Sequence, residues 1–306
     1  MSIHASGLLG LDATVLSPIC DPGDGLNSRR ALPSPDRRMV GPFVFLDHLG
    51  PRVFAAGHGF DMRPHPHIGL AAVTHLIDGE IIHRDSLGAV QAIRPGEVNW
   101  MTAGSGVVHS ERASPRSRAS GGDLLGIQAW VALPARHEEA EPDFAHFGAT
   151  EVPRICAEGV EFTLVAGRSD GLVSPVKTFS DMVLAQIVLT SGARYQVKPE
   201  YAERAIYVIS GEVEISGQPR TFGEAELIVL KLGAEIVLRA PAFHSVRLMV
   251  MGGEPLPEPR HIYWNFVSSS RERIEQAKAD WREGRFPAVP GEPDFIPLPE
   301  DPVRIG

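Results

Sequence analysis

Short runs of apolar residues, separated by turn-forming residues, cover most of the chain. Between residues 43 and 133, Gly, Pro or Asp interrupts the apolar runs at intervals of about 8–12 residues. A second series of strand-like runs, including MVLAQIVLT and AIYVISGEVEI, follows residue 153. Short strands with regular turn signals are typical of β-sandwiches and closed β-barrels. The pattern therefore predicts an all-β protein whose strands form two successive blocks.

Two segments depart from this pattern. Residues 134–153, between the blocks, are rich in proline and acidic side chains, and we interpret them as a connection. Near the C-terminus, Ser269 and Glu272 have the spacing of a capping box, and an apolar stripe with helical period follows until Gly284. This pattern predicts one short helix of about three to four turns. The proline-rich stretch after it is expected to lie extended along a surface.

The two strand blocks contain similar turns. Gly79-Glu80 in the first block and Gly211-Glu212 in the second each stand between apolar runs, and a second turn follows each of them. A repeated order of strand, tight turn, strand and turn indicates two related units. We therefore predict tandem barrels, one formed by residues 1–135 and the other by residues 136–306 together with the C-terminal helix and tail.

Composition limits the partners and the compartment. The chain has 306 residues, which leaves room for two domains, and its net charge of −9 disfavours direct binding of nucleic acid. Cys20 and Cys156 are the only cysteines and stand far apart, so a thiolate metal site or disulfide framework is not expected. No apolar stretch is long enough to cross a bilayer, and the first residues lack the basic start of a secretory signal. We expect a cytoplasmic protein without a membrane partner.

Histidines supply the candidate chemistry. In an extended segment, the side chains of His65 and His67 point to the same face, roughly 6–7 Å apart. His109 and Glu111 repeat this i, i+2 arrangement in a later segment. If the two strands are neighbours or face each other in a barrel, three imidazoles and one carboxylate converge. Such a set suits iron, manganese, nickel, copper or zinc, whereas burying it without a cation would leave polar groups to satisfy.

The order of these motifs resembles the two cupin motifs and, more narrowly, the pirin family. The matching segments are RRALPSPDRRMVGPFVFLDHLGP (29–51), HPHIG (65–69), HRDSLG (83–88), PGEVNWMTAGSGVVHSE (95–111), GGEPLPEP (252–259) and QAKADWREGRF (276–286). The resemblance implies a bicupin of two jelly-roll barrels with one mononuclear metal site in the first. On this chain the family's ligands fall on His65, His67, His109 and Glu111. The ion implied is Fe(II), with Mn, Ni, Cu or Zn as alternatives.

The resemblance also implies an activity. Pirins are described as quercetin 2,3-dioxygenases, so the expected partners are a flavonol-like enolic substrate and dioxygen. In this reading Glu111 is also catalytic, because it either stays on the ion or takes the substrate's proton. Some members of the family act as regulators through protein partners. The alternative is therefore a non-enzymatic, iron-dependent redox sensor that presents a surface to another protein.

Some positions depart from the family pattern. Ile68, Leu70 and Ala71 stand where pirins usually have an arginine, an aromatic residue and a glutamate, which puts flavonol activity in question more than metal binding. His83 is expected to line the site, to orient a ligand of the ion, or to lie at the surface. The second block has no comparable donor set, and its His244 is isolated. We therefore expect the second barrel to be structural.

Overall fold

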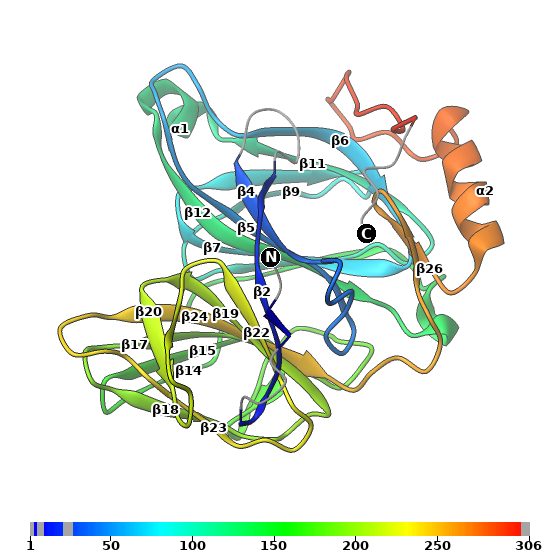
Figure 1. Cartoon of the computed structure of the whole chain (residues 1–306). Helices are drawn as coiled ribbons and strands as arrows, with labels where there is room; N and C mark the ends of the chain where they lie inside the picture. The colour runs from blue at the N-terminus through cyan, green and yellow to red at the C-terminus, as the bar shows by residue number, and fades with distance from the viewer. Residues whose placement is uncertain (1–2, 5–8, 21–26, 301–306) are drawn as a thin grey trace. The chain divides into compact units, whose positions relative to one another are not determined.

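The computed structural model describes residues 3–4, 9–20 and 27–300, and these are built mostly from β-strands (Figure 1). Contacts group the chain into two compact units, each made of three segments. The C-unit comprises Met1–Pro18, Arg29–His48 and Thr150–Pro255, and the N-unit comprises Ile19–Ser28, Leu49–Ala149 and Leu256–Gly306. The start of the chain, where we expect no secretory signal, and the end of the proline-rich tail lie partly outside the described residues. The contiguous division after residue 135 stays a prediction.

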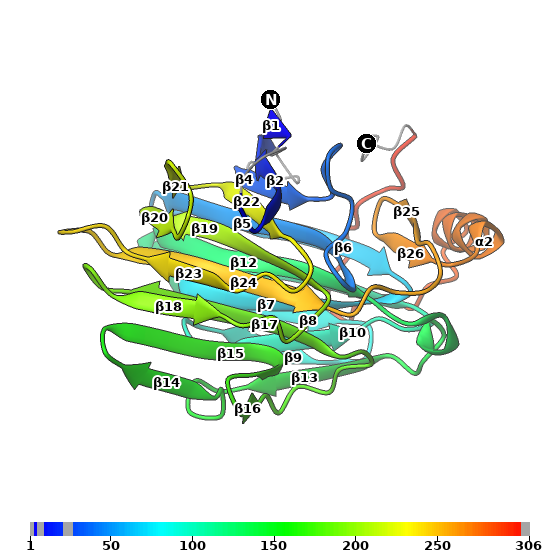
Figure 2. The same ribbon diagram turned by 60° about the horizontal axis from the view of Figure 1, so that its bottom comes forward.

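The C-unit contains a long antiparallel sheet and a shorter one, whose strands are visible in Figure 2. The long sheet has the order β1-β2-β22-β19-β24-β17-β15-β14, with β16 paired to β15, and the short sheet has the order β18-β23-β20-β21. The strands are β1 (Ile3–His4), β2 (Leu11–Leu16), β14 (Arg154–Ala157), β15 (Val160–Ser169), β16 (Leu172–Val173), β17 (Met182–Leu189), β18 (Arg194–Val197), β19 (Glu203–Ser210), β20 (Glu212–Ile215), β21 (Thr221–Gly223), β22 (Glu226–Leu230), β23 (Ile236–Arg239) and β24 (Val246–Gly253).

The N-unit is also built from two main sheets. One has the order β6-β11-β8-β9, and in the other β13, β10, β7 and β12 are consecutive neighbours. The elements are β3 (Ile19–Cys20), β6 (Asp61–His67), β7 (Leu70–Asp78), β8 (Ile81–Asp85), β9 (Val90–Ile93), β10 (Val98–Thr102), β11 (Val107–Ala113), α1 (Pro115–Ser120), β12 (Gly122–Ala132), η1 (Ala135–His137), β13 (Asp143–Phe147), β25 (His261–Tyr263), β26 (Phe266–Ser268) and α2 (Arg271–Arg282). Strands β4 (Ser28–Leu32) and β5 (Phe43–Phe54) contribute residues to both units.

The predicted all-β class with two barrels and a short C-terminal helix is confirmed. Equivalent turns connect the two sheets of each unit: Gly79 joins β7 to β8 with φ = 88°, and Gly211 joins β19 to β20 with φ = 81°. Glycine adopts this left-handed conformation without the steric cost that other residues meet. The two glycines therefore allow the tight turns that the repeated sequence pattern predicted.

Most of the segment predicted as a connection, up to Ala149, belongs to the N-unit. Residues 143–147 form β13, which pairs along its length with β10. Before it, Glu138 is buried and lies 3.0 Å from the Nε of Arg260, whose side chain is fully buried. The same carboxylate accepts hydrogen bonds from the Ser268 hydroxyl and from the backbone and hydroxyl of Ser269. The segment leads from the N-unit into the C-unit at Thr150. It is more than a connection, because Glu138 serves as a buried partner and residues 143–147 complete a sheet.

The C-terminal helix begins one residue later than the capping box predicted. Ser270, rather than Ser269, is the N-cap, and its hydroxyl accepts a hydrogen bond from the backbone N–H of Arg273. Ser269 is unavailable for this role because it binds Glu138. A second helix, α1, was not predicted, although Ser114 followed by Pro115 is a common helix start.

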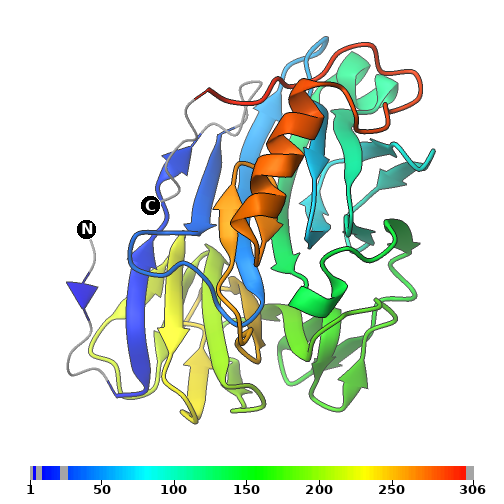
Figure 3. The same ribbon diagram turned by 90° about the vertical axis from the view of Figure 1, so that its right-hand side faces the viewer.

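The helix and the tail after it cover one end of the N-unit, as Figure 3 shows for α2 beside β26. Ile274 and Ala277 of α2 pack in one apolar cluster with Ile68 and Phe266. Farther along, the backbone N–H of Ile296 donates a hydrogen bond to the carbonyl of Pro64, which belongs to β6. The tail therefore lies extended against the unit, as predicted for its described part.

We expect the buried pair of Glu138 and Arg260 to be a major determinant of the N-unit's stability. Replacing Glu138 with Gln removes the nearer carboxylate from a fully buried guanidinium and leaves it only the half-exposed Glu258, 3.7 Å away. This change should lower the free energy of unfolding by about 3 kcal/mol. The matched control is Glu139→Gln, because Glu139 pairs with Arg273 at the surface and should cost at most about 1 kcal/mol. Denaturant unfolding of both variants measures the difference. Equal stability of the two variants would contradict this assignment.

Candidate metal centre

Strand β11 brings the candidate donors together because it pairs with β6 on one side and β8 on the other. In the antiparallel register with β6, His109 stands opposite His65 and Val107 opposite His67. The register shifts between His109 and Glu111. Of the two arrangements considered from the sequence, the structure has the one in which the two histidine strands are neighbours in a sheet.

Three imidazoles form the centre of the site. The Nε2 atoms of His67 and His109 are 3.0 Å apart, and the ring centroid of His65 lies 5.0 Å from that of His67 and 4.4 Å from that of His109. One nitrogen from each ring lies within 4.8 Å of the other two. All three side chains are buried.

Burial keeps these imidazoles neutral. It lowers the pKa of His65 to about 4, although a hydrogen bond from the ring to the Arg63 carbonyl opposes the shift. Burial, with the neighbouring imidazoles, lowers the pKa of His67 and His109 well below the usual value. Neutral imidazole is the form that ligates metals. At neutral pH the cluster therefore offers lone pairs without competition from protons.

Glu111 lies between the two sheets of the N-unit. One carboxylate oxygen accepts a hydrogen bond of 3.0 Å from the hydroxyl of Thr74 on β7, and the other accepts one of 2.7 Å from the amide of Gln128 on β12. Thr74 and Gln128 are themselves cross-strand partners. Burial raises the pKa of Glu111, opposed by His83 and by these two hydrogen bonds. The carboxylate is thus held in place and is a better proton acceptor than an exposed glutamate.

The structure places the four predicted donors, together with His83, in two overlapping groups. His65, His67 and His109 form one group, and His83, His109 and Glu111 form the other. His83 is buried, so its alternative placement at the surface is excluded. The four-residue ligand set remains a prediction, since Glu111 does not fall in the group of His65 and His67.

The chemistry of the donor set fits a divalent metal ion. Metal–imidazole bonds are about 2.0–2.1 Å long, so two nitrogens at right angles on one ion are separated by roughly 3 Å. The Nε2 atoms of His67 and His109 already have this separation. Imidazole and carboxylate donors suit Fe, Mn, Ni, Cu and Zn alike, so the set indicates a metal ion without selecting one.

Three polar residues of the site were not predicted from the sequence. Thr74 and Gln128 hold Glu111, and Asp85 accepts a hydrogen bond of 2.8 Å from His83. Gln128 was detectable as a polar position inside the apolar run LLGIQAWVAL. Asp85 was detectable by its spacing, because positions 83 and 85 of a strand share a face.

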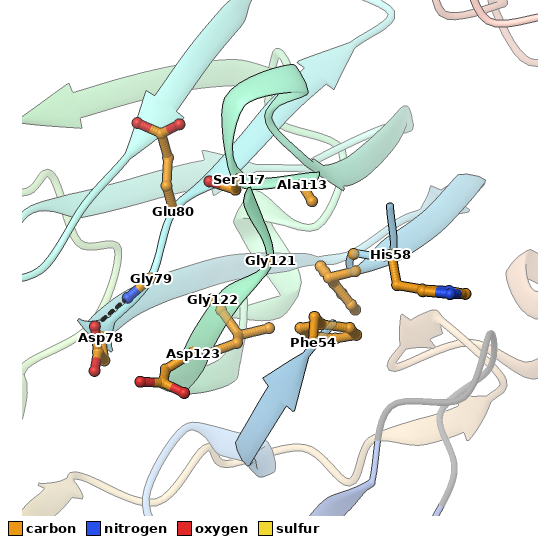
Figure 4. Close-up of a pocket in the computed structure, with 13 residues that line it drawn as sticks. Phe54, His58, Asp78, Gly79, Glu80, Ala113, Ser117, Gly121, Gly122 and Asp123 are labelled. Carbon is orange, nitrogen blue, oxygen red and sulfur yellow. Dashed lines mark hydrogen bonds between the residues drawn. The ribbon is translucent and has the colours of Figure 1, made fainter. Parts of the chain in front are cut away.

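A separate cavity of about 250 Å³ lies in the N-unit and is shown in Figure 4. Its walls include the apolar side chains of Phe54, Phe60 and Leu124 and the carboxylates of Asp78 and Glu80. Both carboxylates already have partners, since Asp78 accepts from the Gly79 N–H and Glu80 pairs with Arg94. The cavity contains none of the metal-donor candidates.

The C-unit offers no matching donor group among the described residues. His244 is exposed, in a turn between β23 and β24. Nor does any helix in the described part of the chain combine the length and apolarity needed to cross a bilayer.

Comparisons with known proteins agree with this architecture. The family model for pirin matches residues 25–131, and the model for the pirin C-terminal cupin domain matches residues 184–287. A pirin-like protein of Caulobacter vibrioides is 48% identical over 276 residues, which cover 89% of this chain and 93% of the relative. A Pseudomonas aeruginosa protein provisionally named a quercetin 2,3-dioxygenase is 37% identical, over 86% of this chain and 81% of that protein.

A solved structure shows the same fold. The crystal structure of quercetin 2,3-dioxygenase from Acinetobacter baumannii superposes with a TM-score of 0.87 at 32% identity, covering 95% of this chain and 96% of that one. Two cupin barrels, one of which carries a buried histidine cluster, define a bicupin. The chain belongs to the pirin family of cupin proteins.

The low pKa of His65 predicts how the metal-free protein responds to acid. In the unfolded chain histidine titrates near 6.5, whereas in the folded protein His65 titrates at about 4. Between these values the unfolded state binds more protons, so stability falls as the pH is lowered. His65 should contribute a loss of about 2–3 kcal/mol between pH 7.5 and 4.5.

This prediction is checked by denaturant unfolding of chelator-treated protein at the two pH values. The variant His65→Gln lacks the titrating ring, so its free energy of unfolding should fall less between pH 7.5 and 4.5. An equal pH dependence in the two proteins would show that His65 is not held neutral by the fold.

Proposed function

We propose that this protein is a metal-dependent dioxygenase that acts on flavonol-like enolic substrates. The observation that carries the proposal is the buried, neutral cluster of His65, His67 and His109, with the carboxylate of Glu111 held beside it. The likeness to the Acinetobacter baumannii quercetin 2,3-dioxygenase, over nearly the full length of both chains, supports the choice of substrate class.

In this proposal His65, His67, His109 and Glu111 hold one divalent ion, with Fe(II) as the expected metal. When bound, the ion supplies Lewis acidity toward an enolic hydroxyl and, if it is redox-active, reactivity toward dioxygen. Ile68, Leu70 and Ala71, the positions that depart from the family pattern, are fully buried. Ile68 packs under α2, so its change from the family arginine fits this chain's own core.

In this proposal Glu111 either stays on the ion or takes the proton of the substrate's hydroxyl. Its raised pKa brings the carboxylate closer to the range in which it exchanges a proton near neutral pH. Thr74 and Gln128 hold both of its oxygens from the opposite sheet. Buried surroundings limit the access of water to this group and so strengthen its interactions with a bound substrate.

The proposal predicts metal-dependent oxygen uptake. Protein reconstituted in parallel with Fe(II), Mn(II), Ni(II), Cu(II) or Zn(II) should consume dioxygen in the presence of quercetin with at least one of these metals, faster than the free ion does. His109→Ala should lose both the bound metal and the uptake, because it removes the ring shared by both donor groups. His244→Ala is the matched control, since this exposed histidine lies in the C-unit.

Oxygen electrode traces and elemental analysis of the same samples give the two readouts. Metal binding without uptake above the free ion would contradict the enzyme and favour the alternative, a non-enzymatic redox-sensing regulator that acts through a protein partner. A His109→Ala variant that keeps its metal would instead contradict the site.

A further inference from the structure

Behind His109 lies a second buried histidine that is bound to a buried carboxylate. The Nε2 of His83 is 2.8 Å from a carboxylate oxygen of Asp85, and its Nδ1 is 3.4 Å from the Nδ1 of His109. The side chains of His83 and Asp85 are almost completely inaccessible, at 3% and 0% exposure. Both are carried by β8, whose residues pair with β11 directly opposite His109 and Glu111.

The carboxylate determines the direction of this chain of hydrogen bonds. Asp85 accepts from the backbone N–H groups of Leu87 and Ala89 through its other oxygen, so its position is fixed by the turn after β8. A carboxylate is an acceptor, so the Nε2 of His83 donates to Asp85. The Nδ1 of His83 then faces His109 and can accept a hydrogen bond from the Nδ1–H of that ring.

This assignment leaves the Nε2 of His109 without a proton, on the side that faces His67. His65 reaches the same tautomer by another route, since its Nδ1 donates to the carbonyl of Arg63 over 2.7 Å. Metal-ligating histidines commonly donate their second N–H to a carboxylate or carbonyl, which fixes the ring and raises its basicity. For His109 the donation passes through an additional imidazole.

We propose that His83 and Asp85 are positioning residues that hold His109 in its Nδ1-protonated tautomer, with Nε2 free for the ion. This inference rests on the proposed role of His109 as a metal ligand. The ring of Phe144 on β13 stacks on His83 at a centroid distance of 4.2 Å and an interplanar angle of 13°. His83 is therefore held from two sides, by a ring above it and by a carboxylate at its edge.

The tautomer can be read directly in the metal-free protein. Long-range ¹H–¹⁵N NMR of histidine-labelled, chelator-treated protein should show His109 protonated on Nδ1 in the wild type. In His83→Phe, which keeps a flat ring next to Phe144 but removes the acceptor, this preference should be lost. His75→Phe is the matched control, because His75 is equally buried but its Nδ1 faces the Glu97 carbonyl.

Metal affinity gives the second readout. His83→Phe and Asp85→Asn should each weaken metal binding by about 10–100-fold, and the double variant should lose little more than the single ones because both act through one chain of bonds. Asp85→Asn keeps an oxygen for the Leu87 and Ala89 N–H groups, so the turn is retained. His83→Asn, whose amide oxygen can accept from His109, should recover part of the Nδ1 tautomer.

The outcomes separate this inference from the proposed function. His109 protonated on Nε2 in the wild type, or unchanged tautomer and affinity in His83→Phe, would overturn it. So would a His83 nitrogen bonded to the ion, because His83 would then be a ligand rather than a positioning residue. If the wild type bound no metal, the proposed function would fail, while the NMR result would still decide whether the pair fixes the tautomer.

Discussion

The site depends on one feature of the N-unit, the position of β11 between β6 and β8. This pairing places His109 opposite His65 on one side and opposite Asp85 on the other. Because side chains on a strand alternate between two faces, His109 and Glu111 point toward the interior while Ser110 and Arg112 face the other way. On that second face, both Ser110 and Arg112 bind Glu292 of the C-terminal tail. A single strand therefore connects the candidate metal donors to the end of the chain.

The same pairing of strands also places hydrogen-bond partners beside the buried donors. Three of the four proposed donors have a partner outside the ligand set that limits their orientation: the Arg63 carbonyl for His65, His83 for His109, and Thr74 and Gln128 for Glu111. Fixing the donors during folding reduces the conformational entropy that is lost when a ligand binds. The polar residues that hold the donors come from both sheets. The packing of the two sheets therefore determines the geometry of the site.

The strands and the pairing of the histidines on one face could be predicted from the sequence, because both depend on local patterns of residues. Short apolar runs separated by glycine turns predicted the strands. The i, i+2 spacing of His65 and His67 predicted that their side chains share a face. What could not be predicted depends on long-range contacts. The burial of Glu138 requires Arg260, more than a hundred residues away, so its segment resembled a solvated linker. The role of Gln128 likewise depends on the packing of β12 against β11. The sequence shows that Gln128 is polar, but it does not show that Glu111 is its hydrogen-bond partner.

The segmented make-up of the N-unit has a consequence for the order in which the protein can mature. Its final segment, which starts at Leu256, supplies Arg260 to Glu138, Glu292 to the strand of His109, and the helix that covers Ile68. A ribosome delivers this segment only after the whole C-unit has been synthesised. Most of the barrel that holds the histidines is therefore encoded before the larger part of the C-unit, but the barrel can be completed only after it.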